Sequence, residues 1–283
     1  MKVVIPAAGM GTRFLPATKS QPKEMLPVLD RPVIQYVVEE AVAAGADDIT
    51  IITGRGKRAL EDHFDLNPEL SAVTDHPAIR SLDELCRKAT IHYVRQREAK
   101  GLADAILRAR MHVGSEPFGV LLGDTINVCE PPLLRQLWDI YQEFGRSVIA
   151  VEPVPAEKLR DYGIIEGRPV RHGVYQCDRF FEKPDLSATE SRLGITGAYV
   201  FTPAIFDAIH DTKPGRGGEL QLTDAMAVLA AREPVFATEF QGTRYDIGDR
   251  YLWMKANLEF AMRHPDLRAR LHPLLKQLSE KEP

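Results

Sequence analysis

The chain has 283 residues, of which 44% are hydrophobic and 27% charged, and its formal net charge is −4. This composition is typical of a globular protein with a sizeable core, and the charge does not favour non-specific nucleic-acid binding. The three cysteines are widely spaced and odd in number, which argues against a disulfide framework. No stretch approaches the roughly 20 apolar residues of a membrane span, and no signal segment precedes the first strand. We therefore expect a cytoplasmic protein that binds neither nucleic acid nor a membrane.

Strands and helices alternate along the first half of the chain. The apolar run 2–7 fits a buried strand, and apolar residues at helical spacing predict a helix over 34–42, with Gly45 at its C-cap. The further elements expected are strand 49–53, helix 57–64, strand 91–94, helix 102–111, strand 118–122, helix 133–144 and strand 148–151. Residues 66–88 show no clear period. This alternation predicts a parallel sheet wrapped by helices.

The second half of the chain has a different rhythm. Extended segments are expected at 162–165, 175–181 and 194–201, followed by a helix after Glu219, a strand at 235–240 and a helix at 251–263. The tail, residues 266–283, is charged and amphipathic, and we interpret it as a docking or dimer helix. No repeat or linker divides the chain, so we expect one domain over 1–283, with halves at 1–150 and 151–265 and a helical tail.

The loop after the first strand is glycine-rich and basic. Gly9 and Gly11 suggest a dinucleotide fold, but Phe14 stands where that fingerprint needs its third glycine. A P-loop is excluded because no GKS or GKT closes the turn. Glycines let backbone N–H groups approach an anion, Arg13 can bind two phosphate oxygens at once, and Lys23 adds a further positive charge. The loop therefore predicts a phosphate site, with a plain turn or a solvated basic face as the alternatives.

The same loop, GMGTRFLPATKSQPKEMLPV, resembles the signature of the bacterial UTP–glucose-1-phosphate uridylyltransferases, a branch of the sugar-nucleotide pyrophosphorylases. The resemblance covers nearly the whole chain, because the family's order is kept by RPVIQYVVEEAVAAG, EDHFD, YVRQREAKGL, LLGD, YGIIEG, FEKP, GGELQLTDA and YDIGD. It implies a Rossmann-like α/β nucleotidyltransferase fold, with a mixed, mostly parallel central sheet flanked by helices and an accessory sugar-binding half. The implied reaction joins UTP and glucose 1-phosphate into UDP-glucose and pyrophosphate.

The resemblance also implies a role for each residue that matches a family motif. The catalytic cations would be Arg13, Lys23 and Lys183. The nucleotide would be bound by Ala7, Ala8, Gly9, Gly11, Thr12, Gln96 and Gly101. The sugar phosphate would be bound by Gly163, Glu182, Lys183, Gly197 and Tyr199. The carboxylates that hold Mg²⁺ would be Asp124 and Asp246. Residues 1–150 would thus serve the nucleotide and 151–265 the sugar.

Several of these roles also suit the chemistry of the side chains. Asp124 follows an apolar strand, and Mg²⁺ usually takes one or two carboxylates and completes its shell with phosphates and water. A glutamine such as Gln96 can pair with both a donor and an acceptor on uracil. Glu182 and Lys183 would point to opposite faces of a regular strand, but Pro184 predicts that the strand breaks there.

The chain departs from the family pattern at a few positions. Ala103 and Asp104 replace Gly-His in GLGHA, and Thr125 replaces a second aspartate after LLGD. Asp104 would either alter nucleotide choice or act as a favourable charge at a helix start. These departures keep open a relative that uses dTTP or another sugar 1-phosphate, and a non-catalytic nucleotide-sugar-binding paralogue. A homodimer or homotetramer is expected, although two segments are shorter than usual in the family.

Overall fold

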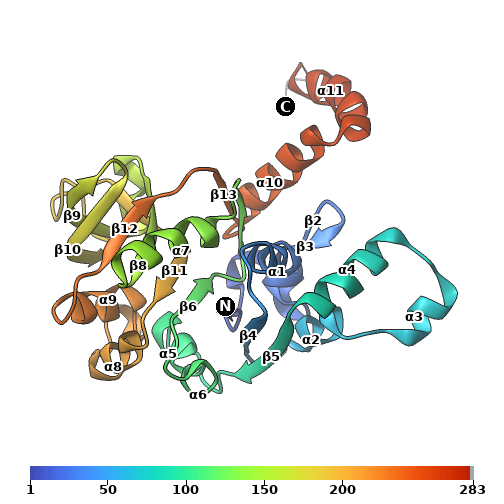
Figure 1. The fold of residues 1–283 in the computed structure, drawn as a ribbon. Coiled ribbons are helices and arrows are strands. Elements are labelled where there is room, and N and C mark those ends of the chain that lie inside the picture. The colour runs from blue at the N-terminus through green and yellow to red at the C-terminus, as the bar shows by residue number, and fades with distance from the viewer. Residues whose placement is uncertain (281–283) are drawn as a thin grey trace.

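The computed structural model describes residues 1–280, without the side chains of Ser71 and Arg216. Its central element is a nine-stranded sheet in the order β5-β4-β1-β6-β11-β8-β12-β10-β9 (Figure 1). The first four strands in this order pair in parallel. They are β1 (Lys2–Pro6), β4 (Asp48–Thr53), β5 (Thr90–Arg95) and β6 (Phe118–Leu121). The predicted parallel arrangement is therefore confirmed for this part of the sheet.

The second half of the chain extends the same sheet with mainly antiparallel strands. These are β8 (Val148–Pro153), β9 (Gly163–Arg171), β10 (Val174–Glu182), β11 (Leu193–Phe201) and β12 (Phe236–Glu239). β11 joins the two parts by pairing antiparallel with β6 and β8. Among the described strands of the second half, only β8 and β12 pair in parallel. The sheet is mixed, as expected, and its parallel character belongs chiefly to the first half.

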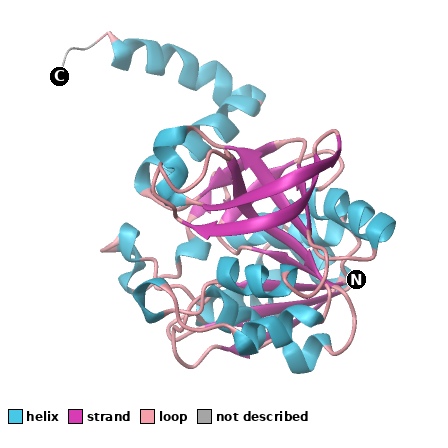
Figure 2. Ribbon diagram, turned by 90° about the vertical axis from the view of Figure 1, so that its left-hand side faces the viewer, coloured by secondary structure: helices cyan, strands magenta, loops and turns pink. Residues whose placement is uncertain are grey.

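Helices cover both faces of the sheet (Figure 2). Alternation along β1 sends Val3 and Ile5 into one core and Val4 into the other, as the two-residue period of a strand requires. The first core lies under α1 (Val33–Ala43), α2 (Arg58–Phe64), α4 (Pro77–Lys88) and α7 (Leu133–Phe144). The second lies under α5 (Leu102–Leu107), α6 (Arg110–Val113), α8 (Ala204–Asp211) and α9 (Leu222–Ala230).

Two sequence interpretations need correction. Residues 66–88 are helical over α3 (Pro68–Val73) and α4, although no period was expected there. In α4, Leu82, Leu85 and Cys86 form the apolar stripe against the core, and Pro77 occupies the first helical turn, where proline is well tolerated. The helix expected over 102–111 is two short helices, α5 and α6.

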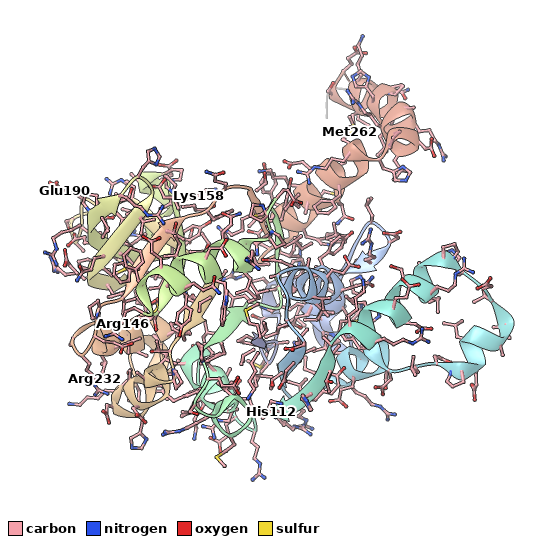
Figure 3. All side chains as sticks on the ribbon, in the orientation of Figure 1. His112, Arg146, Lys158, Glu190, Arg232 and Met262 are labelled. Atoms are coloured by element: carbon pink, nitrogen blue, oxygen red, sulfur yellow. The ribbon has the colours of Figure 1, made fainter. Side chains whose placement is uncertain are left out.

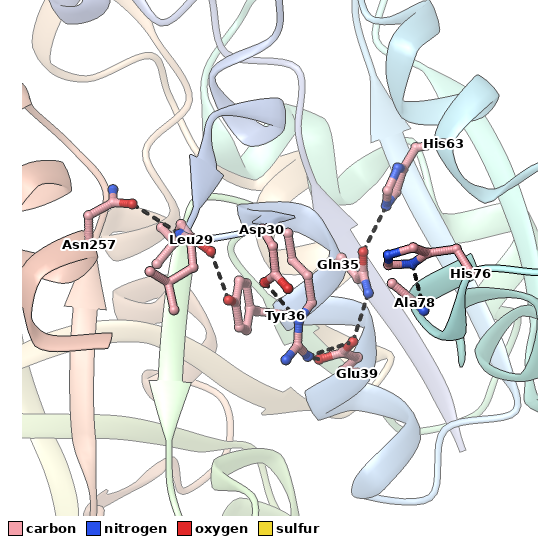
Figure 4. A network of polar contacts seen from close by, with 11 residues as sticks. Leu29, Asp30, Gln35, Tyr36, Glu39, His63, His76, Ala78 and Asn257 are labelled. Carbon is pink, nitrogen blue, oxygen red and sulfur yellow. Dashed lines mark hydrogen bonds and ion pairs between the residues drawn. The ribbon is translucent and has the colours of Figure 1, made fainter. Parts of the chain in front are cut away.

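A small hairpin, β2 (Pro27–Val28) and β3 (Arg31–Pro32), is fastened to two helices by polar contacts (Figure 4). The Tyr36 hydroxyl on α1 donates to the backbone of β2 at 2.8 Å. The Leu29 N–H donates to Oδ1 of Asn257 at 3.0 Å. Within the same network, Oε1 of Gln35 on α1 lies 3.1 Å from Nε2 of His63, which joins α1 to α2. Asn257 belongs to α10 (Arg250–Arg263), so these contacts hold α10 against the first half of the chain.

The expected tail helix is present as α11 (Pro265–Ser279), which with α10 extends away from the sheet (Figure 1). Leu274 and Leu278 are exposed on it. Within residues 1–280, no helix has the length and apolar character needed to cross a membrane.

Candidate active site

A cleft of about 460 Å³ lies beside the carboxyl ends of β1 and β6, between the two halves of the chain. The expected site residues that line it are Gly9, Gly11, Thr12, Arg13, Lys23, Asp124, Gly163, Glu182, Lys183, Gly197, Tyr199 and Asp246. An adjoining cavity of about 320 Å³ shares several of these residues and adds Ala8, Gln96 and Gly101. One contiguous depression therefore collects almost every residue that the sequence singled out.

Ala7 is the exception. Its side chain is 2% exposed and belongs to the core, and it lines neither cavity. Its N–H donates to the carbonyl of Ile52 at 2.9 Å, which continues the β1–β4 ladder by one residue. Ala7 thus extends the strand that leads into the loop, and its predicted contact with the nucleoside stays a prediction.

The glycine-rich loop folds as three single turns of 3₁₀ helix, η1 (Thr12–Phe14), η2 (Ala17–Lys19) and η3 (Lys23–Met25). Gly11 has a φ of 66°, and a Cβ there would meet Cβ of Lys23 at 3.0 Å. The Thr18 hydroxyl donates to the Gly11 carbonyl at 2.7 Å. A left-handed backbone and this close approach both favour glycine, so Gly11 lets the loop fold back over Lys23.

Two short strands bring the two aspartates together. β7 (Thr125–Val128) pairs antiparallel with β13 (Thr243–Asp246), and the register sets Asp246 opposite Thr125. The Ile247 N–H donates to the Asp124 carbonyl at 3.0 Å. Neither strand was expected from the sequence. Their pairing explains how residues 122 positions apart come to share one cleft.

Burial and neighbouring charges shift the pKa values of two cleft residues, Asp246 and Lys23. Burial raises the pKa of Asp246, and the neighbouring charge of Asp124 raises it further. Burial acts to lower the pKa of Lys23, but its ion pair with Asp124 and the nearby carboxylates outweigh that effect and raise it. Asp124 and Asp246 are thus two carboxylates that repel each other in one open cleft, and their oxygens are ligands of the kind that a hard divalent cation prefers.

A buried ion pair that the sequence did not reveal lies under Lys23. Nζ of Lys57 is 2.6 Å from Oε2 of Glu24, and the two side chains are 5% and 1% exposed. Burial raises the pKa of Glu24 and lowers that of Lys57, and in each case the partner's charge only partly offsets this effect. Glu24 follows Lys23 directly, so this pair anchors the turn that presents Lys23 to the cleft.

On the opposite wall of the cleft, β10 ends at Glu182 and Lys183 has a φ of 47°. The strand break expected before Pro184 is therefore confirmed, and both side chains face the same cleft. The Lys183 ammonium lies 3.6 Å from Oε1 of Glu182. The Thr223 hydroxyl donates to Oε2 of Glu182 at 2.8 Å. Thr223 thus orients the carboxylate, a contact that the sequence did not suggest.

Arg244 is a further cleft residue that sequence reasoning missed. Its side chain is 7% exposed, and its guanidinium donates to Oε1 of Glu152 at 2.6 Å and 3.0 Å and to the Tyr162 hydroxyl at 2.8 Å. It also lies 3.6 Å from Asp246. Arg244 precedes Asp246 by two positions on β13, so the two side chains share a face of that strand, but the sequence did not predict a strand there.

The amide of Gln96 has a defined direction. Nε2 donates to the Gly101 carbonyl at 3.2 Å and to Oδ2 of Asp104 at 2.8 Å. Arg108 pairs with the other oxygen of Asp104. Since both partners of Nε2 are acceptors, the amide cannot be flipped without losing two hydrogen bonds. Oε1 accepts no hydrogen bond among the described residues. In this conformation Oε1 is the amide atom that is left to pair with a base, and the predicted pairing of Gln96 with uracil stays a prediction.

Known proteins resemble the chain over nearly its full length. The Nucleotidyl transferase family matches residues 2–261. The UTP–glucose-1-phosphate uridylyltransferase of Bacillus subtilis is 49% identical over 285 residues, covering 99% of this chain and 98% of its own, and that of Staphylococcus epidermidis is 46% identical, with 98% of each covered. A crystal structure of UDP-glucose pyrophosphorylase complexed with UDP-glucose superposes with a TM-score of 0.88 at 41% identity, over 93% of this chain and 99% of that one. A UTP-bound enzyme of this kind from Acinetobacter baumannii gives 0.87 at 35% identity, over 98% and 99%.

The fold and the cleft therefore define a nucleotidyltransferase. Within that class, the chain belongs to the family of the UTP–glucose-1-phosphate uridylyltransferases.

Proposed function

We propose that this protein transfers the uridylyl group of UTP to glucose 1-phosphate and releases pyrophosphate. The observation that carries the proposal is the single cleft in which the basic loop after β1 faces Glu182 and Lys183 across Asp124 and Asp246. Two anionic substrates must meet there, and their repulsion must be offset by cations in fixed positions. The full-length likeness to uridylyltransferases supports the choice of substrates.

In this proposal the loop 9–13 holds the phosphates of the nucleotide. Backbone N–H groups around Gly11 approach the phosphates closely, and Arg13 contributes a guanidinium that is already oriented by the Gly248 carbonyl at 3.3 Å. Lys23 exchanges its contact with Asp124 for the α-phosphate or the leaving pyrophosphate. Lys23, which the turn around Glu24 holds in place, then stabilises the negative charge that develops on the leaving pyrophosphate.

The sugar phosphate is bound on the opposite wall. Lys183 pairs with its phosphate, and Glu182 accepts hydrogen bonds from sugar hydroxyls because Thr223 holds the carboxylate in place. A Cβ at Gly197, where φ is 90°, would lie 2.5 Å from Cδ1 of Leu122, so glycine lets this strand of the cleft wall pack closely against the residue that follows β6. An oxygen of the sugar phosphate can then attack the α-phosphorus in line with the leaving pyrophosphate.

We further propose that Asp124 and Asp246 hold Mg²⁺. Both are carboxylates in the same cleft, and the raised pKa of Asp246 reflects in part a negative charge that a cation would relieve. When bound, the ion supplies positive charge to the phosphate oxygens of the nucleotide.

The nucleobase preference follows from the amide of Gln96. Because Nε2 is fully used by Gly101 and Asp104, Oε1 is the atom left to face a base in the adjoining cavity. A carbonyl oxygen accepts a hydrogen bond from the N3–H of uracil, whereas N3 of cytosine is itself an acceptor. Asp104 thus contributes to nucleotide choice by fixing the amide, in addition to its place in the first turn of α5.

Three further expectations remain part of this proposal. Residues 1–150 serve the nucleotide and 151–265 the sugar phosphate, although Asp246 reaches across. The protein acts as a homodimer or homotetramer, for which the exposed leucines of α11 offer an apolar contact. Its compartment is the cytoplasm.

The decisive experiment measures pyrophosphate release by the purified protein with Mg²⁺ and glucose 1-phosphate, offering UTP, dTTP, GTP, CTP and ATP in turn. We expect release with UTP and much less with CTP. A dTTP preference, or activity only with a different sugar phosphate, would replace the proposed substrates. No release with any pair would favour a binding paralogue, to be tested by nucleotide-sugar binding.

A further inference from the structure

Three potential metal ligands meet at the edge of the sheet opposite the cleft. Asp48 is the first residue of β4 and His92 the third of β5, and both strands run parallel to β1, whose carboxyl end forms the cleft. His112 comes from α6 (Figure 3), and its ring lies within hydrogen-bond distance of Asp48. The cluster is thus separate from the proposed Mg²⁺ site.

The geometry of the cluster suits a small ion. Nε2 of His112 lies 3.3 Å from Oδ1 of Asp48, and Nε2 of His92 lies 3.8 Å from the same oxygen. One ligand atom from each residue lies within 4.8 Å of the other two, and the imidazole centroids are 4.1 Å apart. Ligands about 2 Å from a tetrahedral ion lie roughly 3.3 Å from one another. Small side-chain rotations would therefore bring all three into coordination distance.

Hydrogen bonding alone does not account for this arrangement. A separation of 3.8 Å is too long for a hydrogen bond, and the His92 ring has no other hydrogen bond among the described residues. The three side chains are 28–40% exposed, so an ion from solvent can reach them. The two rings are tilted by 55° to each other and both turn Nε2 toward one carboxylate oxygen, an arrangement that a shared cation would stabilise.

The ammonium of Lys2, on the strand next to Asp48, is bound by other groups. Lys2 is the register partner of Asp48 on β1. Its ammonium donates to the backbone carbonyls of His112 at 3.3 Å and Val113 at 3.1 Å and forms an ion pair with Glu116 at 2.7 Å. Lys2 therefore holds α6, and with it His112, in place, and among the described residues it forms an ion pair with Glu116 and none with Asp48.

We propose that Asp48, His92 and His112 form a second metal site, selective for a divalent transition metal such as Zn²⁺. Imidazole suits Zn²⁺ and its neighbours in the series, whereas Mg²⁺ prefers an all-oxygen shell. Water completes the fourth position. The site joins β4, β5 and α6 on the side of the sheet away from the cleft. Its metal therefore stabilises the fold and takes no part in the transfer of the uridylyl group.

Metal-free protein titrated with Co²⁺ and then Zn²⁺ tests this proposal, with the visible absorption of Co²⁺ and calorimetry as readouts. We expect one equivalent of Co²⁺ to give tetrahedral absorption bands, Zn²⁺ to displace it, and excess Mg²⁺ to leave it in place. Asp48→Asn, His92→Gln and His112→Gln, made singly, should each weaken Zn²⁺ binding at least tenfold. Zn²⁺ should raise the Tm of the unaltered protein and not that of these variants.

Two control variants distinguish metal binding at this cluster from binding by another histidine or by a carboxylate of the cleft. His172→Gln removes an exposed histidine of the β9–β10 turn, and Asp246→Asn removes a carboxylate of the cleft. Both should keep the Co²⁺ bands. Loss of the bands in Asp246→Asn would place the ion in the cleft and overturn the proposal. Equal Zn²⁺ affinity in the three cluster variants and the unaltered protein would do the same, as would the absence of stoichiometric binding.

Discussion

Replacing Lys57 by methionine should destabilise the protein strongly, because Glu24 would be left buried without its cation. At the separation of 2.6 Å between Nζ and Oε2, an effective dielectric constant of about 20 gives an attraction of roughly 6 kcal/mol. Protonation of Glu24 in the variant limits the loss, so we expect about 3–5 kcal/mol. That corresponds to a decrease in Tm of roughly 6–20 °C.

A double-mutant cycle makes the reasoning testable. Burial raises the pKa of Glu24 and lowers that of Lys57, so each charged form is disfavoured by its site. We therefore expect Glu24→Leu combined with Lys57→Met to recover most of the stability that either single variant loses. Urea unfolding of the four proteins measures the coupling free energy.

A control and the dependence on pH complete this test. Arg58→Met removes the neighbouring cation of α2, which is 86% exposed and pairs with Asp62 at 3.4 Å, and should change stability by less than about 0.5 kcal/mol. In Lys57→Met, the pKa of Glu24 rises further above its unfolded value, so the deficit should shrink in acid and grow as pH rises. A loss below about 1 kcal/mol, independent of pH, would refute the account of the pair.

The remaining predictions concern specificity, catalysis and pH. Asp104→Asn should lower the preference for UTP over CTP in kcat/KM by about tenfold, because asparagine can also donate to Gln96 and release the amide; an unchanged ratio would contradict that role. Lys183→Ala should lower turnover by on the order of 10²–10³ with little change in Tm, and near-native turnover would exclude the assignment. Burial raises the pKa of Glu40 from 4.5 to about 7, so the folded state binds a proton that the unfolded state releases. The free energy of unfolding should therefore fall by ~3 kcal/mol as pH rises from 4.5 to about 7. In Glu40→Gln, urea unfolding should show no such decrease. If the free energy of unfolding depended on pH in the same way in the variant and the unaltered protein, this account of Glu40 would be wrong.

The sequence predicted the elements whose signals are local. The alternation around Val3, Val4 and Ile5 indicates a buried strand, and Pro184 indicates the strand break that turns Lys183 into the cleft. The composition of the loop around Gly11 predicts a turn that faces an anion. Each of these features depends on a few neighbouring residues and on backbone preferences that the chain itself displays.

The features that were missed depend on distant partners. The pairing of β7 with β13 joins four-residue strands with little apolar alternation, so it is visible only once the two halves pack together. The Glu24–Lys57 pair likewise connects a loop to the residue that precedes α2. The helices at 66–88 differ, because α4 has an apolar stripe that a search at helical spacing could have found.

The pairing of β7 with β13 has a consequence for the time at which the protein becomes active. Asp124 is synthesised well before Asp246, because β13 comes long after β7 in the chain. A nascent chain that has emerged as far as residue 240 can present the basic loop and Lys183, but it lacks one of the two carboxylates and Arg244. The cleft is therefore completed only after β13 has been synthesised, so a nascent chain that presents the basic loop still lacks part of the set of charges that the folded cleft contains.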